Sequence, residues 1–90
     1  MWRIVEFRLV GHGRLWLRFA DGLCGEVSLS ADLWGPLGEP LRDPAVFAAV
    51  GLDEFGALAW PNGFDAAPDA LWHQLKAGQD REPGGKELAA

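Results

Sequence analysis

The sequence predicts one α+β domain of two layers: a three-stranded antiparallel β-meander, a helix, one or two short strands and a C-terminal helix. Apolar side chains recur with a period near two over residues 4–10 and 14–19, which is typical of half-buried strands. Helix start signals stand at Pro44 and Pro68. At 90 residues the chain is long enough for one small domain.

The first two strands are expected to join through Gly11-His12-Gly13 as a three-residue hairpin loop. This register predicts that three apolar pairs share one side of the sheet: Leu9 with Leu15, Phe7 with Leu17, and Val5 with Phe19. That side should face the core.

The second turn, Ala20-Asp21-Gly22, has two possible lengths. A two-residue Asp-Gly turn would place Leu17 opposite Glu26, whereas a three-residue loop with Gly22 at positive φ places it opposite Gly25. The longer loop also pairs Phe19 with Leu23 and Leu15 with Val27, so we favour it. Residues 23–29 are then the third strand.

The same register fixes the outer face of the meander. Glu6 meets Arg18, and Arg8 meets Trp16 beside Glu26. A tryptophan among charges can mark a partner site, so we name Arg8, Trp16, Arg18 and Glu26 as the candidate partner interface. The competing interpretation is a solvated face of cross-strand charge pairs.

Residues 30–42, with two glycines and two prolines, should form an irregular excursion with one helical turn near Asp32. Leu33, Trp34 and Leu37 are expected to pack back onto the sheet. If Trp16 is only surface, the alternative interface is the segment around Trp34 or the edge strand.

Asp43 is expected to cap a two-turn helix that begins at Pro44 and stops at Gly51. Short strands should lie on either side of Gly56. The second helix should run from Pro68 to about Lys76.

We place the domain in residues 1–78, with Gly78 ending the second helix. Residues 79–90 are polar and contain glycine, so we expect them to form a disordered tail.

The stretch "WPNGFDAAPDALW" should be a structural corner between a strand and this helix. Its corner residues are Trp60, Asn62, Gly63, Asp65 and Pro68. Asn-Gly is a strong turn dipeptide, and Asp65 is expected to cap the helix or its preceding turn.

The five tryptophans divide into two groups. Trp34, Trp60 and Trp72 are expected in the core, whereas Trp2 and Trp16 fall on the outward face of the meander.

Composition argues against several functions. The net charge of −5 disfavours a nonspecific grip on nucleic acid, and no apolar stretch approaches the length of a membrane span. The lone Cys24 suits a reducing compartment, so we expect a cytoplasmic protein. His12 and His73 have no metal-ligand spacing, and no nucleophile–base pair stands out. We therefore expect no catalytic residue, metal or cofactor, and no enzyme.

Three motifs, in this order, resemble a known family: "FADG" at 19–22, "LRDPAVFAAV" at 41–50 and "GALAWPNGFDAAPDALW" at 56–72. The chain is similar over roughly residues 2–76 to the domain of unknown function 2442 family of small bacterial proteins. It departs from the family pattern at Ala66 and Ala67, where a leucine and a small polar cap are usual.

The resemblance implies the same α+β fold and no known activity, cofactor or binding residue. Some members carry a C-terminal helix-turn-helix domain, for which this chain is expected to lack room. The resemblance also implies that many members are encoded beside another small protein, in a toxin–antitoxin-like pair. We therefore predict a non-enzymatic protein-interaction module that binds another small protein or a second copy of itself.

The alternative prediction is a nucleic-acid-associated regulator. It would use the tryptophan and arginines of the meander: Arg3, Arg8, Arg14, Trp16 and Arg18.

Overall fold

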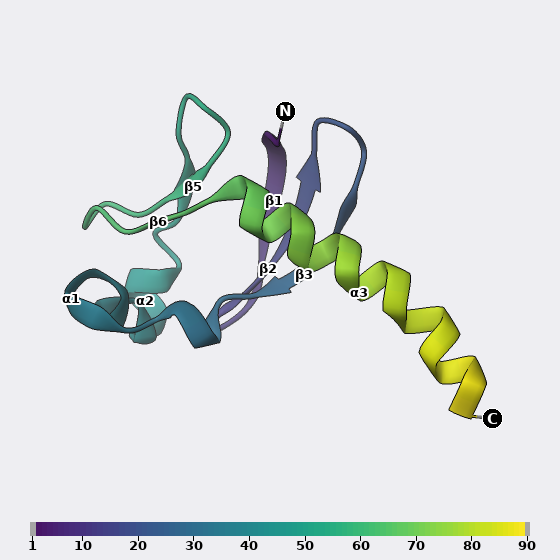
Figure 1. Ribbon diagram of the computed structural model, residues 1–90. Helices are drawn as coiled ribbons and strands as arrows, with labels where there is room; N and C mark the ends of the chain where they lie inside the picture. Colours follow the sequence, from purple (N-terminus) through teal and green to yellow (C-terminus); the bar gives the residue numbers. More distant parts are fainter. Residues whose placement is uncertain (1, 90) are drawn as a thin grey trace.

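Two small antiparallel sheets and a long C-terminal helix make up the protein (Figure 1). The structure, a computed structural model, describes the backbone of residues 2–89 and the side chains of residues 2–78. The elements in chain order are β1 (Ile4–Gly11), β2 (Arg14–Phe19), β3 (Cys24–Ser28), the 3₁₀ turn η1 (Ser30–Asp32), α1 (Gly35–Gly38), the 3₁₀ turn η2 (Glu39–Arg42), α2 (Pro44–Phe47), β4 (Gly51–Leu52), β5 (Leu58–Ala59), β6 (Asp65–Ala66) and α3 (Pro68–Ala89). The predicted α+β class and β-meander are confirmed.

The second turn has the three-residue form that the apolar pattern favours. The Phe19 amide donates to the Leu23 carbonyl at 2.8 Å, and Gly22 has φ +97°. Leu15 pairs with Val27, as predicted.

The first hairpin is confirmed at two of its three predicted pairs. Leu9 pairs with Leu15 and Phe7 with Leu17, but the pairing of Val5 with Phe19 is wrong. A β-bulge at this point adds one residue to β1, so Ile4 takes the place opposite Phe19. An extra residue reverses the faces of a strand, and accordingly Ile4 is buried whereas Val5 is 42% exposed.

The core lies between the meander and the elements that follow it. The meander contributes Ile4, Leu15, Leu17, Phe19, Val27 and Leu29, and the rest of the chain contributes Leu33, Leu41, Phe47, Leu58, Trp60, Leu71 and Leu75. The first turns of α3 pack on β3, and the Gln74 side chain donates to the Ser28 carbonyl at 3.4 Å. The rest of α3 leads away from α1 and α2 (Figure 1).

Residues 30–42 form η1, α1 and η2 in succession. Leu33 is buried as expected, but the prediction that Trp34 and Leu37 pack onto the sheet is wrong, because they are 70% and 48% exposed. Trp34 has an extended backbone, and successive side chains of an extended segment point to opposite sides. With Leu33 directed inward, Trp34 therefore points out.

Both predicted helices exist with different ends. Asp43 caps α2 by accepting from the Ala45 amide at 2.9 Å. The helix ends at Phe47 rather than at the predicted stop, Gly51, which lies in β4. Gly78 does not end α3, which continues to Ala89. Glycine weakens a helix interior without forbidding it. The side chains of the predicted disordered tail, residues 79–90, lie outside the described residues.

None of the helices within residues 2–89 has the length and apolar character to cross a bilayer.

Asp21 ties the second turn of the meander to α3. Its carboxylate accepts from the Leu23 amide at 3.0 Å and from the Trp72 indole at 2.9 Å. These two hydrogen bonds, that of Leu23 foremost, hold the pKa of Asp21 below its ordinary value because they favour the ionised form.

We expect Asp21→Asn to lower the melting temperature at neutral pH and to flatten its decline in acid. A carboxylate with a lowered folded-state pKa stabilises the fold above its unfolded-state pKa, and this contribution is lost as the pH falls through the folded-state pKa. Thermal melts of both proteins from neutral pH to below the ordinary aspartate range measure it. Parallel curves for the two proteins would contradict the linkage.

Candidate functional site

The predicted interface residues come together on the outer face of the meander. Arg18 donates to the Glu6 carboxylate at 2.8 Å and Arg8 donates to it at 3.3 Å. These hydrogen bonds, from Arg18 and then Arg8, hold the pKa of Glu6 below its ordinary value. The Arg8 guanidinium also lies 4.8 Å from the ring centroid of Trp16.

This face satisfies its own charges. Glu26 is bonded to Arg14. The Arg8 guanidinium covers the ring of Trp16, which is therefore half-buried rather than fully exposed. Of the two interpretations of the face, the geometry favours cross-strand charge pairs, which contribute about 0–1 kcal/mol each when exposed. The proposal that Trp16 anchors a partner stays a prediction.

The corner residues form a hairpin rather than a strand-to-helix corner. Asn62 Oδ1 accepts from the Phe64 amide at 3.0 Å, Gly63 has φ +100°, and the Trp60 amide donates to the Phe64 carbonyl at 2.9 Å. Pro68 begins α3, as predicted.

Asp65 does not cap α3. It lies in β6, where it pairs with Ala59, and no hydrogen bond joins its carboxylate to the described first turn of α3. The N-cap position of α3 is Ala67, the residue before Pro68. Asp65 lies two residues earlier, in a strand, which is too early for a cap. Its carboxylate is left exposed.

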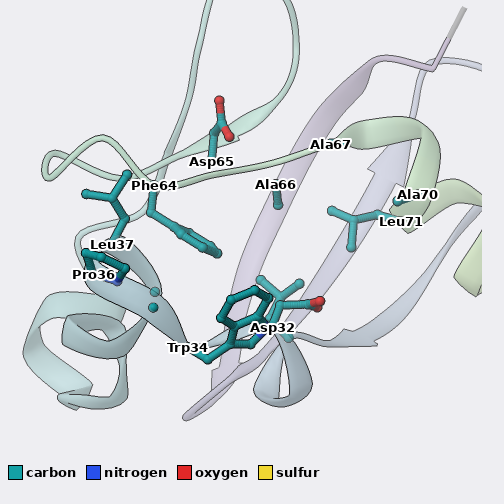
Figure 2. Close-up of a pocket in the computed structure, with 13 residues that line it drawn as sticks. Asp32, Trp34, Pro36, Leu37, Phe64, Asp65, Ala66, Ala67, Ala70 and Leu71 are labelled. Atoms are coloured by element: carbon teal, nitrogen blue, oxygen red, sulfur yellow. The ribbon is translucent and has the colours of Figure 1, made fainter.

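An apolar groove lies between α1 and the start of α3, with a volume of about 550 Å³. Figure 2 shows Pro36, Leu37 and Phe64 on one side of it, Leu71 on the other, and Trp34 below. Its lining residues are Leu29, Asp32, Trp34, Gly35, Pro36, Leu37, Gly38, Phe64, Asp65, Ala66, Ala67, Ala70 and Leu71. We call this set the α1–α3 groove.

Sequence reasoning missed this groove because it placed Trp34 and Leu37 against the sheet. A usable pattern was present in "LWGPLG", where glycine and proline flank large apolar residues. Gly35 at φ +81° turns the chain immediately after Trp34. The side chains of Trp34 and Leu37 therefore stand at the edge of the groove.

The side chains around the groove are mainly apolar. Among the described residues that line it there is no histidine, cysteine, serine or lysine. Across the described residues, no three His, Cys, Asp or Glu side chains gather as metal ligands. The two histidines pack against aromatic rings outside the groove lining. The ring centroid of His12 lies 5.6 Å from that of Phe47, and the ring centroid of His73 lies 5.2 Å from that of Trp72.

The comparisons with known proteins give one match, to a family model. Neither the search of curated proteins nor the search of solved structures found a significant match. One family model matches residues 4–77, which include both sheets and the α1–α3 groove. The chain therefore belongs to the family described as "Protein of unknown function (DUF2442)".

Proposed function

We propose that this chain is a non-enzymatic protein-interaction module that binds its partner through the α1–α3 groove. One observation carries the proposal: large apolar side chains stand in solvent around a cavity that the chain itself does not fill. Trp34 is 70% and Leu37 48% exposed. Exposed apolar patches of this kind mark interaction sites, and tryptophan is among the residues most enriched at binding hot spots.

The finer proposal concerns the partner. We place this chain as the antitoxin-like member of a small bacterial, cytoplasmic pair, with the second small protein seated on the groove. The support is what the family resemblance implies, namely that many members are encoded beside another small protein. A homodimer is the competing arrangement, because twofold dimers are the commonest soluble oligomers.

A nucleic-acid-associated regulator is the second candidate, with the arginines around Trp16 as its phosphate contacts. The geometry supports it less, because Arg8 and Arg18 already share Glu6 and Arg14 is bonded to Glu26. Phosphate binding would have to replace these ion pairs. It would also make affinity fall steeply with salt.

Trp34→Ala is expected to weaken partner binding by at least about 2 kcal/mol, roughly thirtyfold, as at an interface hot spot. Its melting temperature should stay close to that of the parent, since substitutions of exposed side chains usually change stability by less than about 0.5 kcal/mol. The measurement is affinity capture from the source cell, identification of the captured protein, and titration of that purified protein against parent and variant.

Trp16→Ala is the matched control, since it removes a tryptophan from the other candidate surface. The groove proposal expects it to retain binding, whereas the Trp16 interface predicts a loss of about 2 kcal/mol. Loss of binding in Trp16→Ala with retention in Trp34→Ala would move the site to the meander. Capture of nucleic acid by the parent, abolished by moderate salt, would favour the regulator.

A further inference from the structure

We infer that the occupant of the α1–α3 groove is a segment of a partner protein that carries apolar side chains flanked by lysine or arginine. The inference rests on the proposed function, since it names the chemistry of the partner at the same groove. The apolar part follows from the lining, in which Trp34, Leu37, Phe64 and Leu71 surround the cavity (Figure 2).

The cationic part follows from the charges at the rim. Asp32 and Asp65 are the only charged residues among the described lining residues, and both are exposed. Figure 2 shows the Asp32 carboxylate beside Trp34, whereas that of Asp65 points away from the groove, opposite to the side chains of Phe64 and Ala66. A segment lying in the groove therefore meets the Asp32 carboxylate at its edge, and complementary charges steer and orient such contacts.

The part of the chain that supplies the lining is acidic overall. Residues 20–78, which include every lining residue, carry nine acidic side chains and only two basic ones, Arg42 and Lys76. Arg42 Nε donates a hydrogen bond to the Leu33 carbonyl at 2.7 Å. The rim therefore repels an acidic segment.

A second copy of this chain fits the groove poorly for the same reason. Its most exposed aromatic side chain is Phe55, at 72% exposure, in the loop between β4 and β5. Asp53 and Glu54 precede it directly, so its insertion would bring two more carboxylates toward Asp32. Like charges brought together favour a foreign partner over self-association.

The test is selection of a randomised peptide library, displayed on phage, against the parent and against Trp34→Ala. Peptides enriched on the parent alone are groove-dependent, and we expect them to combine aromatic or aliphatic residues with lysine or arginine. One such peptide is then synthesised in three matched forms: as selected, with its basic residues changed to glutamine, and with them changed to glutamate.

Titrations of these forms measure the role of each carboxylate. Asp32→Asn should weaken the basic peptide roughly two- to fivefold, the range of an exposed ion pair, and strengthen the glutamate form. Asp65→Asn is the matched control, because its carboxylate points away from the groove, and it should leave these affinities close to those of the parent. Glu54→Gln removes a carboxylate that is not part of the groove lining and should leave every affinity unchanged.

Two failures are distinguishable. If no peptide depends on Trp34, the groove is not a docking site, and both the proposed function and this inference fall. If groove-dependent peptides are neutral or acidic, or if they bind Asp32→Asn as tightly as the parent, only the cationic partner is overturned.

Discussion

Trp60→Ala is expected to destabilise the domain by about 3–5 kcal/mol, the usual cost of truncating a buried aromatic side chain. Trp60 is 4% exposed, and its ring centroid lies 5.6 Å from that of Phe47 and 5.4 Å from that of Phe64. These contacts join β5, α2 and the hairpin before β6. In a domain of this size the loss corresponds to a fall in melting temperature of more than about 12 °C.

The indole N–H of Trp60 adds a polar contact to this packing. It donates to the Phe47 carbonyl at 2.9 Å, which lies at the end of α2. Trp60→Phe keeps most of the ring volume and removes this donor, while the Phe47 carbonyl still accepts from the Val50 amide at 3.3 Å. We therefore expect a smaller loss, about 0.5–1.5 kcal/mol, the usual contribution of one hydrogen bond.

Thermal melts and urea titrations of the two variants measure these losses. Trp34→Ala serves as the control for removing a tryptophan from an exposed position, since Trp34 is 70% exposed. A melting temperature of Trp60→Ala within a few degrees of that of Trp34→Ala would mean that Trp60 does not anchor the second sheet.

The register of the meander could be predicted because two independent patterns agree on it. Apolar alternation decides which face each strand buries, and the Ala20-Asp21-Gly22 turn fixes the offset between β2 and β3. The bulge beside Val5 could not be predicted. It inserts one residue without a glycine or proline to mark it, and only the tertiary fit of Ile4 to the core selects it.

The Asn62-Gly63 hairpin shows a different limit. The dipeptide is a strong hairpin indicator, but the residues after it, Phe64-Asp65-Ala66-Ala67, lack the β-branched pattern of a strand. Sequence reasoning therefore assigned Asp65 to a helix cap. In the structure, β6 is a strand because it completes the sheet beside β5, a tertiary effect that overrides local propensity.

The α1–α3 groove depends on the same kind of non-local effect. Its walls come from residues 29–38 and 64–71, which no periodicity connects. Apolar composition alone cannot say whether Trp34 fills the core or stands beside a cavity, because the direction of the side chain depends on the backbone at Trp34 and Gly35. The corresponding candidate site on the meander was predictable because neighbouring strands bring its residues together.

Gly56→Ala is the second substitution expected to have a large effect, about 2–4 kcal/mol, from positive-φ strain and overpacking together. Gly56 is buried at φ +80°, and its carbonyl accepts from the Ile4 amide at 2.9 Å, which joins the β4–β5 loop to β1. An added Cβ would lie 3.2 Å from Arg3 Cα and closer still to the Arg3 side chain.

Gly63→Ala separates the two causes in this prediction. Gly63 has φ +100°, but nothing lies within 4 Å of a Cβ built there, so it carries the conformational strain without the clash. We expect it to cost about 1–2 kcal/mol, the penalty of a left-handed conformation for a residue with a Cβ. The additional loss in Gly56→Ala, measured by urea titration of both variants, is then the cost of displacing Arg3 and the start of β1. Equal losses in the two variants would show that the β4–β5 loop moves freely against β1, and that the contact between Gly56 and Arg3 does not hold the two sheets together.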